Sequence, residues 1–304
     1  ETQDTIAFQQ AHTLFFEHVG GIYNTMVYDN MKVAVARFVG HNEKQPTKGL
    51  LTLSTYYGFN FRFCNIRSGN EKGHVERSVE YVRRKAFAFK DTFDSLEEAN
   101  NYLLSTCITL NNKPLTTDKN IIPAKTLQQE LPYLLPKLPM LDCSDTRECR
   151  VDKYSCITYK QNRYSVLDKY VGQIVLVKAY ANKIIVFFDN IKIAEHVRTF
   201  GLFDWNIKLE HYLNTLHKKS GALENSTAML NLDTKIKNIY NKYFTQNPKE
   251  FLDLYEIILE KGLNNVQKAI EELEKISPIG ISAEKVKLIC NKKIIEENID
   301  TVDD

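Results

Sequence analysis

Hydrophobic positions in the first third of the chain switch between helical and strand-like spacing. Apolar residues between positions 5 and 18 form a helical stripe that ends at a pair of glycines. A short β-prone run over residues 24–28 follows, and it ends on Asp29-Asn30. Residues 46–57 are typical of a helix, whereas residues 59–66 alternate aromatic and polar side chains as a strand does.

Two further helices are predicted after this strand. The first begins near Lys72, because apolar residues between positions 75 and 86 are spaced by four, three and four. The second covers residues 95–109, with Asp94 or Ser95 as its N-cap. Strands and helices that alternate in this way favour an α/β unit.

The remaining chain changes its pattern twice. Residues 111–146 contain five prolines, which break any long helix and predict a connector along the surface. Residues 147–200 have a spacing of two with turn-forming pairs between short runs, as in a small β-barrel or sandwich. Residues 201–304 have helical spacing, so the predicted order is an α/β unit over residues 1–110, a connector, an all-β barrel and an all-α tail. The runs expected to form strands are residues 149–159, 163–166, 174–180, 184–188 and 192–196.

Charge and composition restrict the possible functions less than the hydrophobic pattern restricts the fold. The 40 basic and 38 acidic residues nearly cancel, so only a local cluster of cations could indicate a nucleic-acid partner. No run of about 18 apolar residues predicts a membrane span, and no signal peptide is recognisable, so a cytoplasmic location is expected. The six cysteines form no C-x-x-C pair, which predicts reduced thiols and no zinc site. The chain also begins without Met, so it is either processed or cut from something longer.

Two carboxylates occupy positions that suit a functional site. Asp29 directly follows a predicted strand, where an α/β sheet presents side chains to a ligand crevice. Glu76 lies near the start of a predicted helix, 47 positions later. Each also has an ordinary explanation, because Asp is common in turns and Glu near a helix N-terminus complements the helix dipole.

The residues around these carboxylates resemble a known family. Tyr28-Asp29-Asn30-Met31-Lys32 and the block Glu71–Val79 resemble the second and third acidic positions of DDE transposases and retroviral integrases. More specifically, they resemble the IstA-type transposases of bacterial insertion sequences. The resemblance covers about the first 230 residues in the family's order. It includes Tyr56–Phe59, Tyr81–Arg84, Leu96–Asn100, Leu131–Pro139, Arg163–Val166 and His211–Ala222.

The resemblance implies an RNase H-like fold and a metal-dependent reaction. Three carboxylates of this family converge on two Mg²⁺ (or Mn²⁺) ions, and Asp29 and Glu76 match two of them as metal ligands and catalytic residues. Two such ions stabilise the attacking and leaving oxygens of an in-line displacement at phosphorus. Water would first free a 3′-hydroxyl at each transposon end, and that hydroxyl would then attack target DNA. The implied partners are transposon-end and target double-stranded DNA, further copies of the chain, and an IstB-like AAA+ ATPase.

One departure from the family pattern concerns the first carboxylate. The family's first Asp lies on an earlier strand, whereas Asp4 is expected to cap the first helix. We therefore expect an RNase H-like domain that is incomplete at its N-terminus, and a chain that alone has little strand-transfer activity. Two alternatives remain open: a fragment that binds DNA without chemistry, and a non-catalytic scaffold for protein assembly.

Basic residues near both regions are candidates for contacting DNA phosphates. Lys72, Arg77, Arg83 and Arg84 belong to the segment that carries Glu76, and Arg83 lies seven residues, or two helical turns, beyond it. Cations of the predicted barrel are interspersed with tyrosines, which suits sequence-independent backbone binding. The barrel candidates are Arg150 and Arg163. Solvated cationic faces on a helix or an exposed sheet produce the same pattern.

Overall fold

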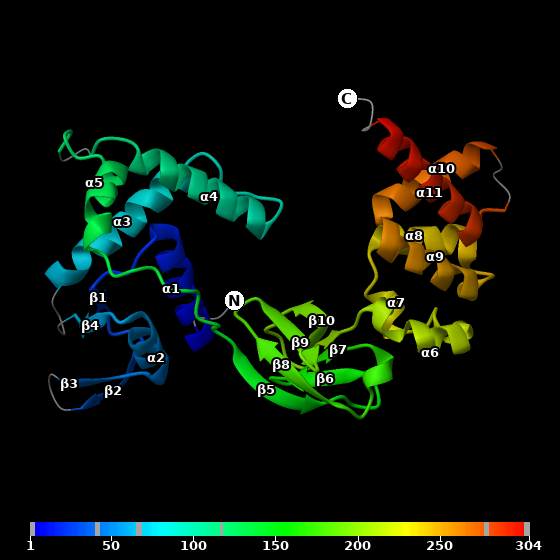
Figure 1. The fold of residues 1–304 in the computed structure, drawn as a ribbon, viewed down its shortest axis with the longest axis horizontal. Coiled ribbons are helices and arrows are strands. Elements are labelled where there is room, and N and C mark those ends of the chain that lie inside the picture. The colour runs from blue at the N-terminus through cyan, green and yellow to red at the C-terminus, as the bar shows by residue number, and fades with distance from the viewer. Residues whose placement is uncertain (1–3, 40–42, 65–68, 116–117, 277–279, 301–304) are drawn as a thin grey trace. The chain divides into compact units, whose positions relative to one another are not determined.

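The computed structural model describes residues 4–39, 43–64, 69–115, 118–276 and 280–300. The chain divides into two compact units, Glu1–Ser144 and Asp145–Asp304 (Figure 1). Both strands and helices are present, and the second unit ends in a helical region, so the prediction of a mixed α/β chain with a helical C-terminal part is confirmed. No helix in the described ranges is long and apolar enough to cross a membrane.

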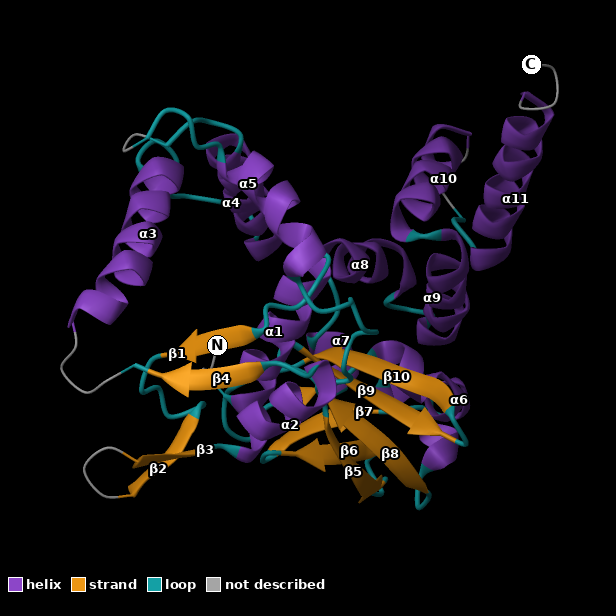
Figure 2. Cartoon of the chain, turned by 60° about the vertical axis from the view of Figure 1, so that its left-hand side comes forward, coloured by secondary structure: helices purple, strands orange, loops and turns teal. Residues whose placement is uncertain are grey.

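The first unit is built around a parallel pair of strands. Strand β1 (Thr25–Tyr28) pairs with β4 (Asn60–Phe63), and both arrows run side by side in Figure 2. Helix α1 (Thr5–Val19) precedes β1, and helix α2 (Lys48–Tyr57) precedes β4. Both helices end where the sequence predicts, because each is followed by a glycine with positive φ that closes its last turn.

Between β1 and α2 lies an antiparallel hairpin that the sequence did not predict. It consists of β2 (Val35–Val39) and β3 (Glu43–Pro46), whose register shifts between Val35 and Arg37. The hairpin leads directly into α2, because Thr47 caps that helix and its hydroxyl also donates to the carbonyl of Val33 at 2.7 Å.

Two longer helices and a short one complete the first unit. Helix α3 (Gly69–Phe87) begins slightly before its predicted start, and α4 (Leu96–Asn111) has as its N-cap Ser95, one of the two residues predicted for that position. The proline-rich segment contains helix α5 (Pro123–Glu130) and the 3-10 helix η1 (Leu131–Tyr133). Proline tolerates the first helical turn, and Pro123 occupies that place in α5.

The same proline-rich segment is tied to the core of the first unit. Ile22 and Leu135 exchange two backbone hydrogen bonds of 3.1 and 2.8 Å, and the amide of Leu141 donates to the Tyr57 hydroxyl at 3.0 Å. These contacts lie beside one apolar cluster that collects residues from α1, β1, α2 and β4. Its buried members are Phe16, Ile22, Tyr28, Ala34, Leu50, Leu53, Tyr57 and Phe59.

The second unit begins with two sheets that share a buried apolar cluster. The four-stranded antiparallel sheet has the order β10-β9-β8-β5, and the three-stranded sheet has the order β11-β7-β6. The expected strand over residues 149–159 is wrong as a single element, because a turn at Asp152–Ser155 divides it. The strands are β5 (Asp145–Arg150), β6 (Cys156–Tyr159), β7 (Asn162–Ser165), β8 (Ile174–Ala179), β9 (Lys183–Phe188), β10 (Ile191–Val197) and β11 (Trp205–Asn206).

Helices follow the sheets to the end of the described chain. Their core contains Phe251, Leu254 and Val266, each with no exposed surface. Residues 240–244 widen into a π-helical turn, so the described tail is helical but not uniformly α-helical. The α-helices are α6 (Leu213–Lys218), α7 (Thr227–Leu230), α8 (Thr234–Ile239), α9 (Pro248–Lys261), α10 (Leu263–Ile276) and α11 (Ala283–Asp300). Three short 3-10 or π segments accompany them, η3 (Leu209–Tyr212), η4 (Ser220–Ala222) and η5 (Tyr240–Phe244), whereas η2 (Asp168–Tyr170) lies between β7 and β8.

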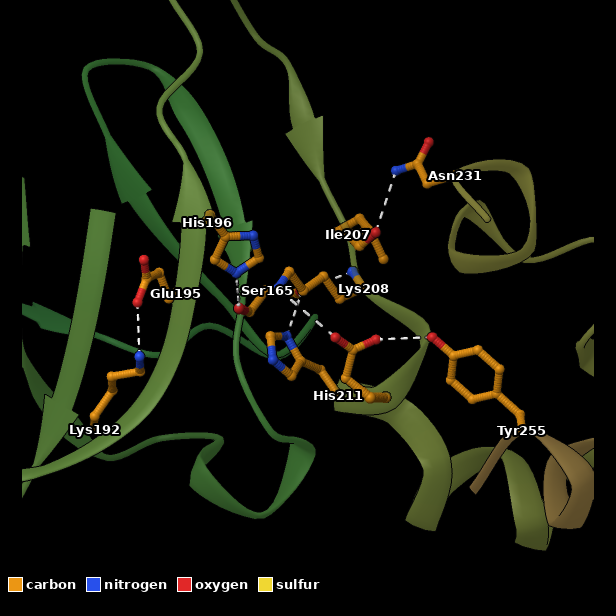
Figure 3. A network of polar contacts seen from close by, with 10 residues as sticks. Ser165, Lys192, Glu195, His196, Ile207, Lys208, His211, Asn231 and Tyr255 are labelled. Atoms are coloured by element: carbon orange, nitrogen blue, oxygen red, sulfur yellow. Dashed lines mark hydrogen bonds and ion pairs between the residues drawn. The ribbon is translucent and has the colours of Figure 1, made fainter. Parts of the chain in front are cut away.

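A buried polar network joins the sheets to these helices around Ser165 (Figure 3). The ring of His196 donates from Nε2 to the Ser165 carbonyl at 2.6 Å, and His211 Nδ1 lies 2.7 Å from the Ser165 hydroxyl oxygen. The amide of Lys208 donates to that same oxygen at 3.0 Å. The hydroxyl hydrogen is therefore available for His211, and one serine satisfies groups from β10 and η3.

Candidate functional site

Asp29 lies at the carboxyl end of β1, directly after the strand's last residue. Tyr28 is in register with Phe63 of β4, and the amide of Cys64 donates to the Tyr28 carbonyl at 2.9 Å. Parallel strands present the residues that follow them at one edge of the sheet. The sequence-based placement of Asp29 after a strand is confirmed, although that placement alone assigns it no chemistry.

The strand end that carries Asp29 is anchored by α1. His12 Nδ1 donates to the Phe8 carbonyl at 2.7 Å, so the neutral ring accepts at Nε2 from the Tyr28 hydroxyl, 2.8 Å away. Burial lowers the pKa of His12 from its usual 6.5, which keeps the ring in this neutral form. Burial also raises the pKa of the Tyr28 phenol, so that group remains a hydrogen-bond donor. The hydrogen bond between the Tyr28 side chain and His12 therefore holds the strand end just before Asp29 in place.

A buried oxygen next to Asp29 has no hydrogen-bond partner among the described residues. It is the side-chain carbonyl oxygen of Asn30, whereas the backbone amide of Asn30 donates to Asp29 Oδ1. A buried acceptor without a partner is costly, and such atoms often belong to functional sites. Carboxylate and amide oxygens are also the ligands that Mg²⁺ accepts, so this pair fits a hard cation. The sequence analysis named Asn30 only as a neighbour of Asp29.

Glu76 and Lys72 both lie on α3, seven and three residues after its first residue, Gly69. Their side chains fall outside the described part of the structure. Asp4, by contrast, is the N-cap of α1 and accepts from the amide of Ala7 at 3.0 Å, as predicted. No group of three or more His, Cys, Asp or Glu residues arranged to hold a metal is found among the described residues.

Three of the four cations predicted on α3 have described side chains, and all three are exposed. Arg77, Arg83 and Arg84 all have exposed side chains, and Arg84 Nε lies 3.8 Å from Glu80 one helical turn earlier. Such an exposed pair contributes little to stability, so the Arg84 guanidinium is readily available to another anion.

The two cations predicted in the second unit differ in their surroundings. Arg150 extends from β5, and its Nε donates to the Gly172 carbonyl at 3.2 Å. Arg163 on β7 pairs with Asp152 at 3.3 Å and lies 4.3 Å from the centre of the Trp205 ring. Arg163 is therefore half-buried and held by an ion pair and a ring face, whereas Arg150 is exposed and held by one backbone carbonyl.

Comparison with known proteins gives these positions a context. Residues 135–203 match the family described as Mu transposase, C-terminal domain. A transposase for insertion sequences IS1326/IS1353 from Pseudomonas aeruginosa is 29% identical over 273 residues, or 86% of this chain. A transposase from Aminobacter aminovorans is 26% identical over the same length, and the transposase for insertion sequence element IS21 from Pseudomonas aeruginosa is 30% identical over 203 residues, or 65% of this chain.

The chain is homologous to insertion-sequence transposases of the IstA type.

The transposase homology extends over both compact units, since 86% of the chain is aligned in the first of these comparisons. The chain spans about half the length of the curated transposases it matches: 53% of the IS1326/IS1353 protein and 51% of the IS21 protein. The Mu transposase match begins in the proline-rich segment and ends just before Trp205. It therefore contains both sheets except β11.

Proposed function

We propose that this transposase relative takes part in DNA transposition by two-metal phosphoryl transfer, with Asp29 and Glu76 as two of the metal-holding carboxylates. The observation that carries the proposal is the position of Asp29 at the carboxyl end of β1, beside the unpartnered oxygen of Asn30. Homology to insertion-sequence transposases over 86% of the chain supports it.

The proposed site is of the RNase H-like type, with Asp29 and Glu76 holding Mg²⁺ or Mn²⁺. When bound, such ions stabilise the oxygens that attack and leave the phosphorus atom. The chain's own contribution is to fix the carboxylate at the strand end, which it does through the His12–Tyr28 hydrogen bond. Rigid support of this kind matters because a misplacement of about 1 Å can cost about 100-fold in rate.

The exposed cations are proposed to hold DNA backbone. Arg77, Arg83 and Arg84 on α3, together with Lys72, would contact phosphates near the reacting strand. Arg150 and Arg163 would contact duplex DNA from the second unit, whose two sheets we propose to act as a small barrel-like DNA-binding domain over residues 147–200. Phosphate contacts of this kind position DNA without reading its sequence.

The remaining parts of the proposal concern assembly. We propose a catalytic part over residues 1–110, a connector over residues 111–146 and a helical region over residues 201–304 that serves protein contacts. The partners would be transposon-end and target DNA, further copies of the protein, and an IstB-like AAA+ ATPase. Two transposon ends must be handled together, which favours pairing of protomers.

The test is cleavage of terminal-repeat DNA with Mg²⁺ by the protein encoded in the complete reading frame. Asp29→Asn and Glu76→Gln should each abolish cleavage while DNA binding in a mobility-shift assay stays intact. Asp91→Asn, which removes an exposed carboxylate after α3, is the matched control and should cleave normally. Cleavage by either site variant at the normal rate would show that the assignment is wrong.

A second candidate function is DNA binding or assembly without chemistry. It is favoured by one observation, namely the exposed cations Arg77, Arg83 and Arg84 on α3, which can bind DNA phosphates without any metal. This candidate predicts that Asp29→Asn and Glu76→Gln change nothing, and that the protein with its normal residues binds duplex DNA but never cuts it.

A further inference from the structure

A pocket of about 370 Å³ lies within the second unit, where the sheets meet the following segments. Tyr154, Ser155 and Val171 line it from the part of the chain that matches the Mu transposase family, and Trp205, Leu216 and Ala228 line it from the residues beyond. We call it the Trp205 pocket. Its volume falls in the range of about 300–1,000 Å³ that is usual for small-molecule sites.

The turn that forms one wall is fixed by a single carboxylate. Asp152 Oδ1 accepts from the amides of Tyr154 and Cys156 at 2.8 and 3.0 Å, and its Oδ2 pairs with Arg163. These bonds hold Ser155 at a φ of 57°, a left-handed conformation that is uncommon outside glycine and that persists only where its surroundings enforce it. Tyr212 adds a further tie, because its hydroxyl donates to the Tyr154 carbonyl at 2.8 Å.

Two exposed aromatic rings belong to the lining of the pocket. Tyr154 is 51% exposed and Trp205 is 43% exposed, and their ring centres lie 6.0 Å apart at an angle of 74°. The Arg163 guanidinium lies 4.3 Å from the Trp205 ring centre and 5.7 Å from that of Tyr154, so it supports both rings. Large aromatic side chains left open beside a cavity are the usual platform on which another flat ring can stack.

The polar groups of the pocket suit a flat, hydrogen-bonding ligand. Ser155 is only 5% exposed, and its hydroxyl has no hydrogen-bond partner among the residues that the structure describes. Asp168 also lines the pocket, but its carboxylate already accepts from Asn214 at 3.0 Å and twice from Thr215 at 2.8 Å. The carboxylates of Asp152 and Asp168 both accept hydrogen bonds from neighbouring groups. The exposed ammonium group of Lys153 lines the pocket and can bind an anion such as a phosphate.

We propose that the Trp205 pocket binds the base of an unpaired nucleotide, with the ring stacked on Tyr154 or Trp205 and its phosphate near Lys153. A nucleotide combines the three features that the pocket offers: a flat ring, hydrogen-bonding edges for the Ser155 hydroxyl and an adjacent negative charge. An aromatic side chain of a partner protein would use the rings but would leave the cation and the hydroxyl without a role. The inference rests on the proposed function only in that DNA is the source of the nucleotide.

The test uses the full chain and the fluorescence of Trp205, which is the sole tryptophan. The probes are single-stranded oligothymidylate and oligodeoxyadenylate of eight nucleotides, and an abasic oligomer with the same phosphates but no bases. The base-containing strands should quench the fluorescence, and the abasic strand should not. Tyr154→Ala should weaken base-dependent binding about tenfold, a loss that lies within the range base–aromatic stacking typically contributes. Tyr154→Phe should retain it.

The variant is suited to this comparison because its backbone contacts survive. Both the amide of Tyr154, which donates to Asp152, and its carbonyl, which accepts from Tyr212, remain in the alanine variant. Tyr133→Ala removes another exposed tyrosine that does not line the pocket, and it should leave the titrations unchanged.

Three outcomes would overturn the proposal. Equal quenching by the abasic strand would show that phosphates alone are bound, and unchanged affinity in Tyr154→Ala would remove the stacking role. Quenching by a phenylalanine-containing peptide instead of the oligonucleotides would identify a protein partner. If duplex DNA still binds while the bases have no effect, only the pocket inference is wrong, whereas loss of all DNA binding contradicts the proposed function as well.

Discussion

Acidification from pH 7 to pH 4.5 should destabilise the second unit through its two buried histidines. His196 and His211 are 4% and 5% exposed, and their ring centres lie 5.5 Å apart. The charged groups that face them are Lys208, which opposes a second positive charge, and Glu210, which favours one. Burial outweighs the carboxylate, and the pKa of each histidine falls from 6.5 to about 4.

The sign and size follow from proton linkage. Above pH 6.5 both histidines are neutral in the folded and unfolded chain, and they cause no pH dependence. Between pH 6.5 and about 4 the unfolded chain binds protons that the folded chain excludes, so stability falls as the pH falls. For His196 alone, a pKa lowered from 6.5 to about 4 corresponds to about 3 kcal/mol lost across that interval.

Urea unfolding at several pH values measures this effect directly. Trp205 is the sole tryptophan and belongs to the second unit, so its fluorescence follows the relevant transition. His196→Gln keeps a donor for the Ser165 carbonyl but removes the ionising ring, and it should reduce the loss of unfolding free energy between pH 6.5 and 4.5. His18→Gln removes an exposed histidine and is the control. The reasoning is refuted if His196→Gln and the unmodified chain lose the same free energy over that interval.

Three further substitutions test the packing that supports the two units. Tyr28→Phe removes the partner of His12 and should lower the free energy of unfolding by about 1 kcal/mol; far-UV circular dichroism in urea measures it, and an unchanged midpoint would remove the anchoring role. Phe251→Ala deletes a fully buried ring and should cost about 3–5 kcal/mol in the same assay, against little for Leu259→Ala on the exposed side of α9; equal losses would contradict the assigned core. Ser95→Ala should cost about 1 kcal/mol, because the Ser95 hydroxyl accepts from the Glu98 amide at 3.1 Å, and Ser95→Asp, which can still cap the helix, should restore most of that loss.

Local signals in the sequence were sufficient for most elements of the first unit. The stripe over residues 5–18 and the β-prone run before Asp29 became α1 and β1 because periodicity and glycine stops agreed with the fold. The β2–β3 hairpin was missed because its strands are short and β3 is mostly polar, so its pairing with β2 defines it. Short strands of this kind depend on their neighbours more than on their own residues.

The turn at Asp152 shows a second limit of local patterns. Residues 149–159 alternate well enough to predict one strand, yet the chain reverses where the Asp152 side chain accepts two backbone amides. A side chain that bonds to nearby amides offers the backbone an alternative to the sheet ladder. The alternation of apolar and polar residues gives no sign of these two hydrogen bonds. The division into β5 and β6, and with it the Trp205 pocket, could therefore not be predicted from the sequence.

In the candidate site, too, the sequence motif could be recognised, whereas the residues that hold it in place could not. A motif identified Asp29 and Glu76, since residues flanking a functional carboxylate can be matched without knowing what they touch. The supports are different: His12, sixteen residues before Tyr28, holds the strand end, and Asn30 contributes a buried oxygen. The contact between His12 and Tyr28 arises only when α1 packs on β1. In the cleavage assay proposed for Asp29 and Glu76, a variant that keeps the motif but disrupts the α1–β1 contact should therefore bind DNA and lose cleavage, because the carboxylate would remain present but no longer be held in place.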